Sequence, residues 1–152
     1  MVNMHNKLTN IDRVKKIKEI LFLNSQAADS QLADFINTQA IIKSPANFSN
    51  LTGISGLRAA LSYWKKAFTY SRSSWISVEN TDNTVTVQWE AECVHTGDDF
   101  FGVKAEEQPL SYGGTTTYEF IDGKLVSYRV DVDIEAIKQQ LQLNLQQNLT
   151  LC

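Results

Sequence analysis

The chain has 152 residues and a formal net charge of -3, with 14 basic and 17 acidic side chains. A chain of this length can bury roughly 70% of its unfolded surface, so its core needs no disulfide or metal. The sequence has no long run of lysine or arginine and no apolar stretch that could span a bilayer, which argues against a nucleic-acid partner and a membrane anchor. The charged N-terminal segment has no apolar core and predicts a cytoplasmic protein.

Cysteine and histidine are sparse. The two cysteines, Cys93 and Cys152, are too few for a disulfide framework. His5 and His95 lie far apart and lack the spacing of metal ligands. The sequence also has no phosphate-binding loop and no dinucleotide-binding fingerprint. We therefore expect neither a metal nor a cofactor.

Helical periodicity dominates the first half of the sequence. A helix is predicted over residues 10–24, and a short helix over residues 29–36. A short apolar run at residues 40–42 then leads into a polar loop over residues 43–53. The clearest helix begins near Ser55, and its apolar side chains share one helical face. They are Leu57, Leu61, Trp64 and Phe68.

From residue 74 onward, apolar and polar residues alternate, which is typical of half-buried strands. Strands are predicted over residues 75–78, 85–93, 110–121 and 125–133. Asp122-Gly123 predicts a tight hairpin turn between the last two strands, because both positions tolerate a positive φ. Gly113-Gly114 lies inside a strand, where it predicts a bulge or a bend.

A last helix is predicted over residues 134–149, with Asp133 as its N-cap. The helices and strands are therefore segregated along the chain, which predicts the α+β class. We expect a single domain over residues 1–152, with frayed ends at about residues 1–9 and 147–152.

Several motifs then occur in an order that resembles one family. They are Gly53-Ile54-Ser55-Gly56-Leu57-Arg58, the strand segment Val87-Gln88-Trp89, His95-Thr96-Gly97, Phe101-Gly102-Val103, the hairpin Phe120–Val126, and Asp133. The chain resembles the SnoaL-like polyketide cyclases of the nuclear transport factor 2-like superfamily over residues 11–141. It departs from them at Lys104–Gln108, where the family often has a Pro-Pro-x-Gly turn, and at Arg129, where it often has tryptophan.

The resemblance implies a cone: a strongly curved, mixed but mainly antiparallel sheet that packs against N-terminal helices and is followed by a C-terminal helix. It also implies a pocket for a small apolar or carbonyl-containing molecule, and a homodimer that pairs through the sheet. Members with cyclase activity use a pocket carboxylate on the last strand to move a proton next to a carbonyl group, without a cofactor. The fold alone does not establish such an activity.

The resemblance makes Asp131 the candidate acid/base, with His95 and Arg129 as polar partners. Burial in an apolar wall would raise the pKa of the Asp131 carboxyl and suit it to proton exchange near neutral pH. The alternative is that Arg129 pairs with Asp131 and holds it ionised and inert. His95 has the alternative of ordering the loop after its strand.

The candidate ligand-binding residues are Trp64, Phe68, Trp89, Thr117 and Asp133. Trp64 and Phe68 share the inward face of the clearest helix, where core packing and ligand contact are both expected. Asp133 has the alternative of capping the last helix. A hydroxyl of Tyr112 or Tyr118 could hold an enolate oxygen, although both also suit a core position. The sequence thus predicts a small-molecule pocket protein. It is either a cofactor-free cyclase, isomerase or dehydratase, or a non-catalytic ligand-binding or dimeric interaction domain.

Overall fold

The computed structural model describes residues 8–23, 30–45 and 51–150. The helices are α1 (Asn10–Leu23), α3 (Gly53–Ala67) and α4 (Ile134–Thr150). The strands are β1 (Ile36–Lys43), β2 (Leu51–Thr52), β3 (Phe68–Thr81), β4 (Thr84–His95), β5 (Gln108–Ile121) and β6 (Lys124–Asp131). No helix in the described part of the chain is both long and apolar enough to cross a membrane.

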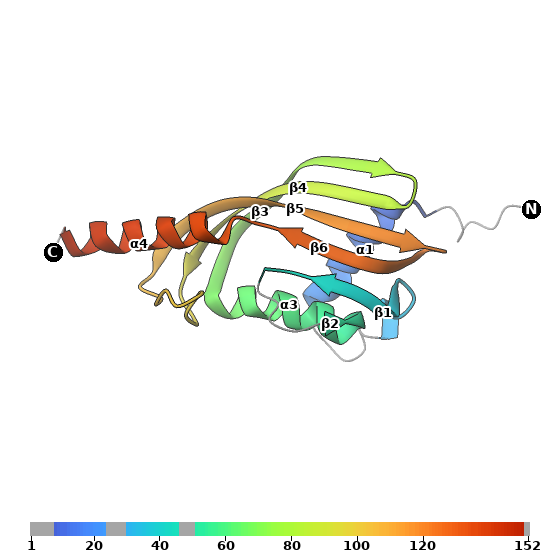
Figure 1. The fold of residues 1–152 in the computed structure, drawn as a ribbon, viewed down its shortest axis with the longest axis horizontal. Helices are drawn as coiled ribbons and strands as arrows, with labels where there is room; N and C mark the ends of the chain where they lie inside the picture. Colours follow the sequence, from blue (N-terminus) through green and yellow to red (C-terminus); the bar gives the residue numbers. More distant parts are fainter. Residues whose placement is uncertain (1–7, 24–29, 46–50, 151–152) are drawn as a thin grey trace, which may run out of the picture.

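The strands form one mixed sheet with the order β2-β1-β6-β5-β4-β3. β1 and β6 run parallel, and the other neighbouring strands run antiparallel. The strands are long and curved, and α4 extends past the end of the sheet (Figure 1). The predicted α+β class is confirmed, with a curved mixed sheet, N-terminal helices and a C-terminal helix.

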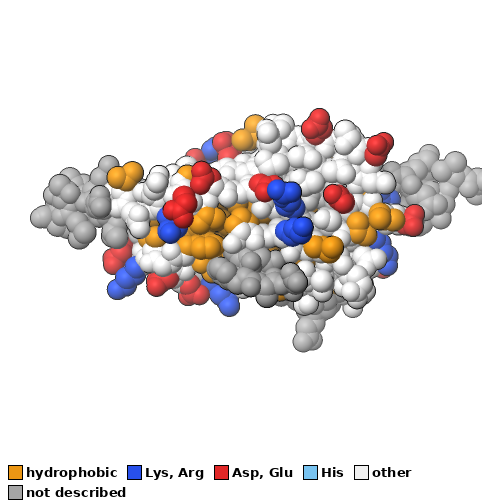
Figure 2. Space-filling view, in the orientation of Figure 1, with side chains coloured by type: hydrophobic (Ala, Val, Ile, Leu, Met, Phe, Trp, Pro, Cys, Tyr) orange, Lys and Arg blue, Asp and Glu red, His pale blue; other side chains and the backbone are white. Residues whose placement is uncertain are grey.

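The two faces of the sheet differ in character. We call the face covered by α1 and α3 the inner face; Val87 of β4 and Phe120 of β5 belong there to the same buried cluster as Leu57 of α3. The opposite, outer face carries charged side chains, such as Arg72 of β3, which forms an ion pair with Glu92 of β4 at 3.0 Å. Figure 2 shows acidic and basic side chains scattered among hydrophobic ones, so this side of the molecule has no patch of a single charge.

The buried side chains form two clusters. The larger one joins α1, α3 and the inner face of the sheet; its largest members include Ile17, Leu57, Phe120, Leu125 and Tyr128. The smaller cluster joins the C-terminal end of α3 to α4. It consists of Trp64, Ala67, Phe68, Cys93, Phe100, Val103, Leu110, Ile137 and Leu141. Because burial of apolar surface is the main stabilising term, these clusters fix how the helices sit on the sheet.

Helix α4 is attached to an open strand edge. Residues 108–114 of β5 have β4 on one side but extend past the last pair with β6 on the other. The Ser111 backbone N–H donates to Oε1 of Gln140 at 2.9 Å, and Nε2 of Gln140 donates to the Ser111 carbonyl at 3.1 Å. Nδ2 of Asn144 donates to the carbonyl of Pro109 at 2.7 Å. Two side-chain amides of α4 thus occupy the place of a further strand.

The predicted short helix over residues 29–36 is wrong in its second half. Its first residue lies outside the described part of the chain, helical geometry ends at Leu32, and strand β1 begins at Ile36. β1 pairs with β6 and buries Ile36 and Ala40 on the inner face. Pairing within the sheet therefore outweighs the local helical pattern.

The predicted strand over residues 75–78 is only a part of β3, which has 14 residues. Its register against β4 shifts between Tyr70 and Arg72 and again between Trp75 and Ser77. Each shift resets the alternation of faces, so the sequence shows no regular period of two. Most of β3 is also exposed and carries few apolar side chains.

Helix α3 begins at Gly53, two positions before the predicted start near Ser55. Gly53 has a φ of +67°, and a Cβ there would lie 2.7 Å from the carbonyl oxygen of Thr38. Only glycine fits such a position without strain. The helix ends at Ala67, and Phe68 has extended geometry and opens β3 instead of continuing the helix.

Candidate functional site

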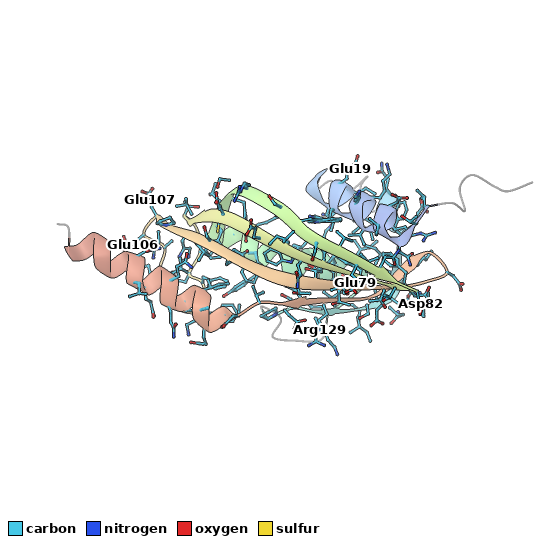
Figure 3. The ribbon with its side chains drawn as sticks, turned by 90° about the horizontal axis from the view of Figure 1, so that it is seen from above. Glu19, Glu79, Asp82, Glu106, Glu107 and Arg129 are labelled. Carbon is cyan, nitrogen blue, oxygen red and sulfur yellow. The ribbon has the colours of Figure 1, made fainter. Side chains whose placement is uncertain are left out.

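Asp131 and Arg129 lie on the outer face of β6, and not in the expected pocket wall. Arg129 is paired with Thr117 of β5, whereas its neighbour Tyr128 points to the inner face and is buried. Nε of Arg129 donates to the Asp131 carboxylate at 3.2 Å, and the two side chains are 62% and 53% exposed. Figure 3 shows Arg129 at the margin opposite helix α1. Because Tyr128 and Val130 occupy the inner face, the residues between them must point outward.

Thr117 and Asp133 also lie away from the inner face. Thr117 is half-buried and shares the outer face with Arg129. Asp133 lies before α4, and its Oδ1 accepts a hydrogen bond from the backbone N–H of Ala136 at 3.0 Å. Asp133 is therefore the N-cap of α4, as its alternative assignment predicted.

His95 is fully buried at the end of β4. Its Nε2 lies 2.7 Å from the carbonyl oxygen of Asp98, and its ring centroid lies 5.0 Å from that of Phe68. Since a carbonyl oxygen can only accept, Nε2 carries the hydrogen and Nδ1 is the basic nitrogen. Nδ1 is buried and has no hydrogen-bond partner among the residues that the structure describes. The contact with Asp98 orders the loop that follows β4.

Two of the predicted ligand-binding residues, Trp64 and Trp89, contact the ring of Tyr112, and a third, Phe68, contacts Trp64. The ring of Tyr112 stacks on Trp64 with centroids 5.6 Å apart and planes at 14°, and it meets Trp89 edge-on at 5.5 Å and 85°. The rings of Trp64 and Phe68 lie 6.3 Å apart. We call Trp64, Phe68, Trp89 and Tyr112 the aromatic wall; α3, β3, β4 and β5 each contribute one member.

Gly113-Gly114 positions Trp89 and does not form the predicted bulge. The pairing of β4 with β5 continues through both glycines without a shift in register. A Cβ at Gly114 would lie 2.7 Å from Cζ2 of Trp89, and one at Gly113 would lie 2.9 Å from the Trp89 carbonyl oxygen. Nε1 of Trp89 donates to Oγ1 of the buried Thr116 at 2.9 Å. The two glycines thus let the indole lie close against β5.

Tyr112 of the aromatic wall also contacts Tyr70 of β3: their hydroxyl oxygens lie 2.7 Å apart. We call these two residues the tyrosine pair. Burial raises the pKa of both phenols, so both are protonated at neutral pH. Burial also raises the pKa of the nearby Cys93 thiol to about 12. The groups at this site are therefore neutral, and the phenols are hydrogen-bond donors.

No sequence pattern indicated Tyr70 as a site residue. The residue precedes the first register shift of β3 and is followed by the polar run Ser71–Ser74, so it shows no strand period. Tyr112 does alternate with its neighbours and was a candidate. Only the sheet order, with β4 between β3 and β5, reveals that the two tyrosines meet.

A hollow of about 180 Å³ lies between α1 and α3. Leu21 of α1 and Leu61 of α3 give it an apolar part, and Arg58, Ser62 and Lys65 of α3 give it a polar part. None of these residues was a candidate: Leu21 and Leu61 belong to apolar helical faces that predict core packing, and Arg58 and Lys65 lie off the apolar face of α3. The described residues contain no group of three or more side chains that could hold a metal ion.

Solved structures share this fold. A proposed SnoaL-like polyketide cyclase from Jannaschia sp. CCS1 has a TM-score of 0.72 and 16% identity, with 87% of this chain and 90% of that chain covered. IdmH from Streptomyces antibioticus, a proposed polyketide cyclase, has a TM-score of 0.66 and 17% identity, with 89% and 99% covered. AclR from Streptomyces galilaeus, a proposed hydroxylase, has a TM-score of 0.65 and 17% identity, with 88% and 98% covered.

At these identities the likeness concerns the fold alone, and proteins that share a fold can differ in chemistry. No curated protein matches the sequence. The sequence model of the family described as SnoaL-like polyketide cyclase matches residues 14–141, which is most of the chain. The protein therefore belongs to the SnoaL-like polyketide cyclase family.

Proposed function

We propose that the protein binds a small, largely apolar molecule with a carbonyl group at the aromatic wall. The observation that carries this proposal is that Trp64 and Trp89 both contact the ring of Tyr112, whose hydroxyl group belongs to the tyrosine pair. Aromatic rings offer apolar contact area, and a few fixed polar groups orient a ligand, which is the usual composition of a small-molecule site. Membership of a family described as polyketide cyclases supports a carbonyl compound, because polyketides carry such groups.

A cofactor-free cyclisation, isomerisation or dehydration of the bound compound is the second candidate function. It is favoured by the family and by His95, whose Nδ1 is a basic nitrogen without a described partner. In this reaction His95 would take a proton from the carbon next to the carbonyl group. We assign no proton transfer to Asp131, because its carboxylate is exposed and forms an ion pair with Arg129. Binding without chemistry is the alternative, since Nδ1 is buried and a substrate must first reach it.

We also propose that the protein is a cytoplasmic homodimer whose two copies pair through the outer face of the sheet. Arg72 with Glu92, and Arg129 with Asp131, place charges of both signs on that face, so two copies could align opposite charges. Light scattering coupled to size-exclusion chromatography measures the mass directly. A monomer at high protein concentration would remove the dimer from the proposal without affecting ligand binding.

A matched probe pair tests binding: 4-fluoroacetophenone carries the carbonyl group, and 1-ethyl-4-fluorobenzene lacks it. We expect both to broaden or shift in ¹⁹F NMR spectra with the protein, and to move the indole N–H signals of Trp64 and Trp89. If neither probe binds at millimolar concentration, binding at the aromatic wall is wrong.

The catalytic candidate is tested by hydrogen–deuterium exchange at the methyl group of 4-fluoroacetophenone in D₂O. Enolisation catalysed by the protein would make exchange faster than in buffer, and His95→Gln would abolish the acceleration. Exchange at the buffer rate in the presence of bound ketone would leave binding as the function of the site.

A further inference from the structure

The tyrosine pair joins two strands that are not neighbours. Tyr70 on β3 is paired with Cys93 of β4, and Tyr112 on β5 is paired with Ala91 of β4. Neighbouring strands lie about 4.8 Å apart, so β3 and β5 are separated by roughly twice that distance. The two phenol side chains converge above β4, where Ala91 and Cys93 are small enough to leave room for them.

The orientation of the tyrosine pair is set by the rings around it. Trp64 lies flat against one side of Tyr112, and Trp89 meets Tyr112 nearly at a right angle. Tyr70 meets Phe68 edge-on, with centroids 6.2 Å apart and planes at 67°. Hydrogen-bond donors that are held in place before a ligand arrives need no reorganisation when they bind it.

The hydrogen-bond inventory of the pair leaves one donor available. Each phenol has one hydrogen to donate, and a single bond between the two oxygens uses only one of them. Neither hydroxyl makes another hydrogen bond to the side chains and backbone described in residues 8–23, 30–45 and 51–144. Tyr70 is also 37% exposed, so the pair can be reached from outside the core.

We propose that the tyrosine pair donates this remaining hydrogen to a carbonyl or enol oxygen of a flat, ring-containing ligand whose ring packs against Trp64 and Trp89. This inference rests on the proposed binding at the aromatic wall and names the contact that selects the ligand. If it is correct, the protein should bind a ligand with a carbonyl oxygen more tightly than a ligand of similar shape that lacks this oxygen.

The charge state of the pair supports this role. Because burial raises the pKa of both phenols, neither provides a negative charge that would repel an enolate. Neutral donors in a partly buried site stabilise an oxygen more as negative charge develops on it. The same site would therefore stabilise the enolate of a bound ketone more than its keto form.

The test compares the affinities of 4-fluoroacetophenone and 1-ethyl-4-fluorobenzene by ¹⁹F NMR titration of the full chain. One hydrogen bond to an oxygen contributes about 1 kcal/mol, so the ketone should bind wild-type protein about fivefold more tightly. The double variant Tyr70→Phe/Tyr112→Phe should bind the two probes equally. Tyr118→Phe is the control, because Tyr118 lies on the same strand but in the larger core cluster.

The single variants Tyr70→Phe and Tyr112→Phe identify which hydroxyl contacts the ligand. Only the loss of the hydroxyl that donates to the ligand should remove the preference for the ketone. Equal affinities of wild-type protein for the two probes, or a preference that persists in the double variant, would overturn the inference and leave binding at the wall intact. Failure of both probes to bind would instead overturn the proposed function, and the inference with it. Amide spectra of each variant confirm that it is folded.

Discussion

Arg129 and Asp131 form an ion pair with 3.2 Å between Nε and the carboxylate, and both side chains point outward from β6. Exposed pairs of this kind contribute little to stability, because water screens both charges. This position separates Asp131 from the aromatic wall, which lies on the inner face. In one copy of the chain, the ion pair of Arg129 and Asp131 therefore lies on the surface of the sheet.

Asp131→Asn should change the free energy of unfolding by less than about 1 kcal/mol, because an exposed ion pair contributes little. The same substitution should leave ketone affinity and methyl exchange unchanged. Urea denaturation and the ¹⁹F titration measure the two effects. A loss of ketone binding in Asp131→Asn would place the carboxylate at the ligand site and contradict its assignment to the outer face.

Asp133→Ala should destabilise the protein by about 0.5–2 kcal/mol, because the substitution removes the N-cap of α4. Asp133→Asn is the matched control, since its side-chain oxygen can still accept the N–H of Ala136. Urea denaturation of both variants gives the difference. Equal losses would mean that charge, and not the cap hydrogen bond, is what α4 requires.

Gly114→Ala should cost about 1–3 kcal/mol, the usual penalty for adding a methyl group where there is no room. The new Cβ would lie 2.7 Å from the Trp89 ring and 2.9 Å from the Asp131 carbonyl oxygen. The indole must move, so its N–H signal should shift as the bond to Thr116 is lost. Thr117→Ala on the outer face of the same strand is the control, and its indole signals should stay in place.

Stability should fall as the pH rises above 9. The pKa of Cys93 rises from 9.0 to about 12 on folding, so the unfolded chain loses this proton first. The stabilisation is complete below pH 9 and is lost as the pH approaches 12. The raised pKa values of Tyr118 and Tyr128 act in the same direction above pH 10. Each group contributes up to about 1.4 kcal/mol per pH unit to the slope.

Urea unfolding at pH 8, 9, 10 and 10.5 measures this loss of stability. Cys93→Ala should have a shallower slope between pH 9 and 10, because the variant has no thiol to titrate there. A slope equal to that of the wild type in this interval would mean that the folded protein does not shield the thiol.

Much of the fold could be predicted from local signals. Asp122 and Gly123 have φ values of +52° and +79°, as a tight hairpin turn between β5 and β6 requires. The apolar face of α3 places Leu57 and Trp64 in the core as its period predicts. The turn and the helical face each depend on residues that are close together in the sequence, so a local pattern is enough to predict them.

The candidate site depends on which face of a strand is covered, and this could be predicted only in part. The alternation of side chains along β6 places Arg129 and Asp131 on the face opposite Tyr128. The sequence does not say which face is covered, because polar side chains can line a pocket as well as face water. The inward position of Trp64 followed from its helix, whereas the contact of Tyr70 with Tyr112 depends on strand order and on two register shifts in β3. Such long-range geometry has no local signature.

The side-chain amides of Gln140 and Asn144 have a further consequence for the behaviour of the protein in solution. An unpaired stretch of strand presents N–H and C=O groups that another chain can add to, which is a common route to aggregation. On β5 these groups are already bound by α4 at Ser111 and Pro109. A helix can satisfy the edge without offering a new one, because its own backbone groups are bonded internally. Helix α4 thus ends the growth of the sheet in that direction and protects the chain from edge-to-edge polymerisation.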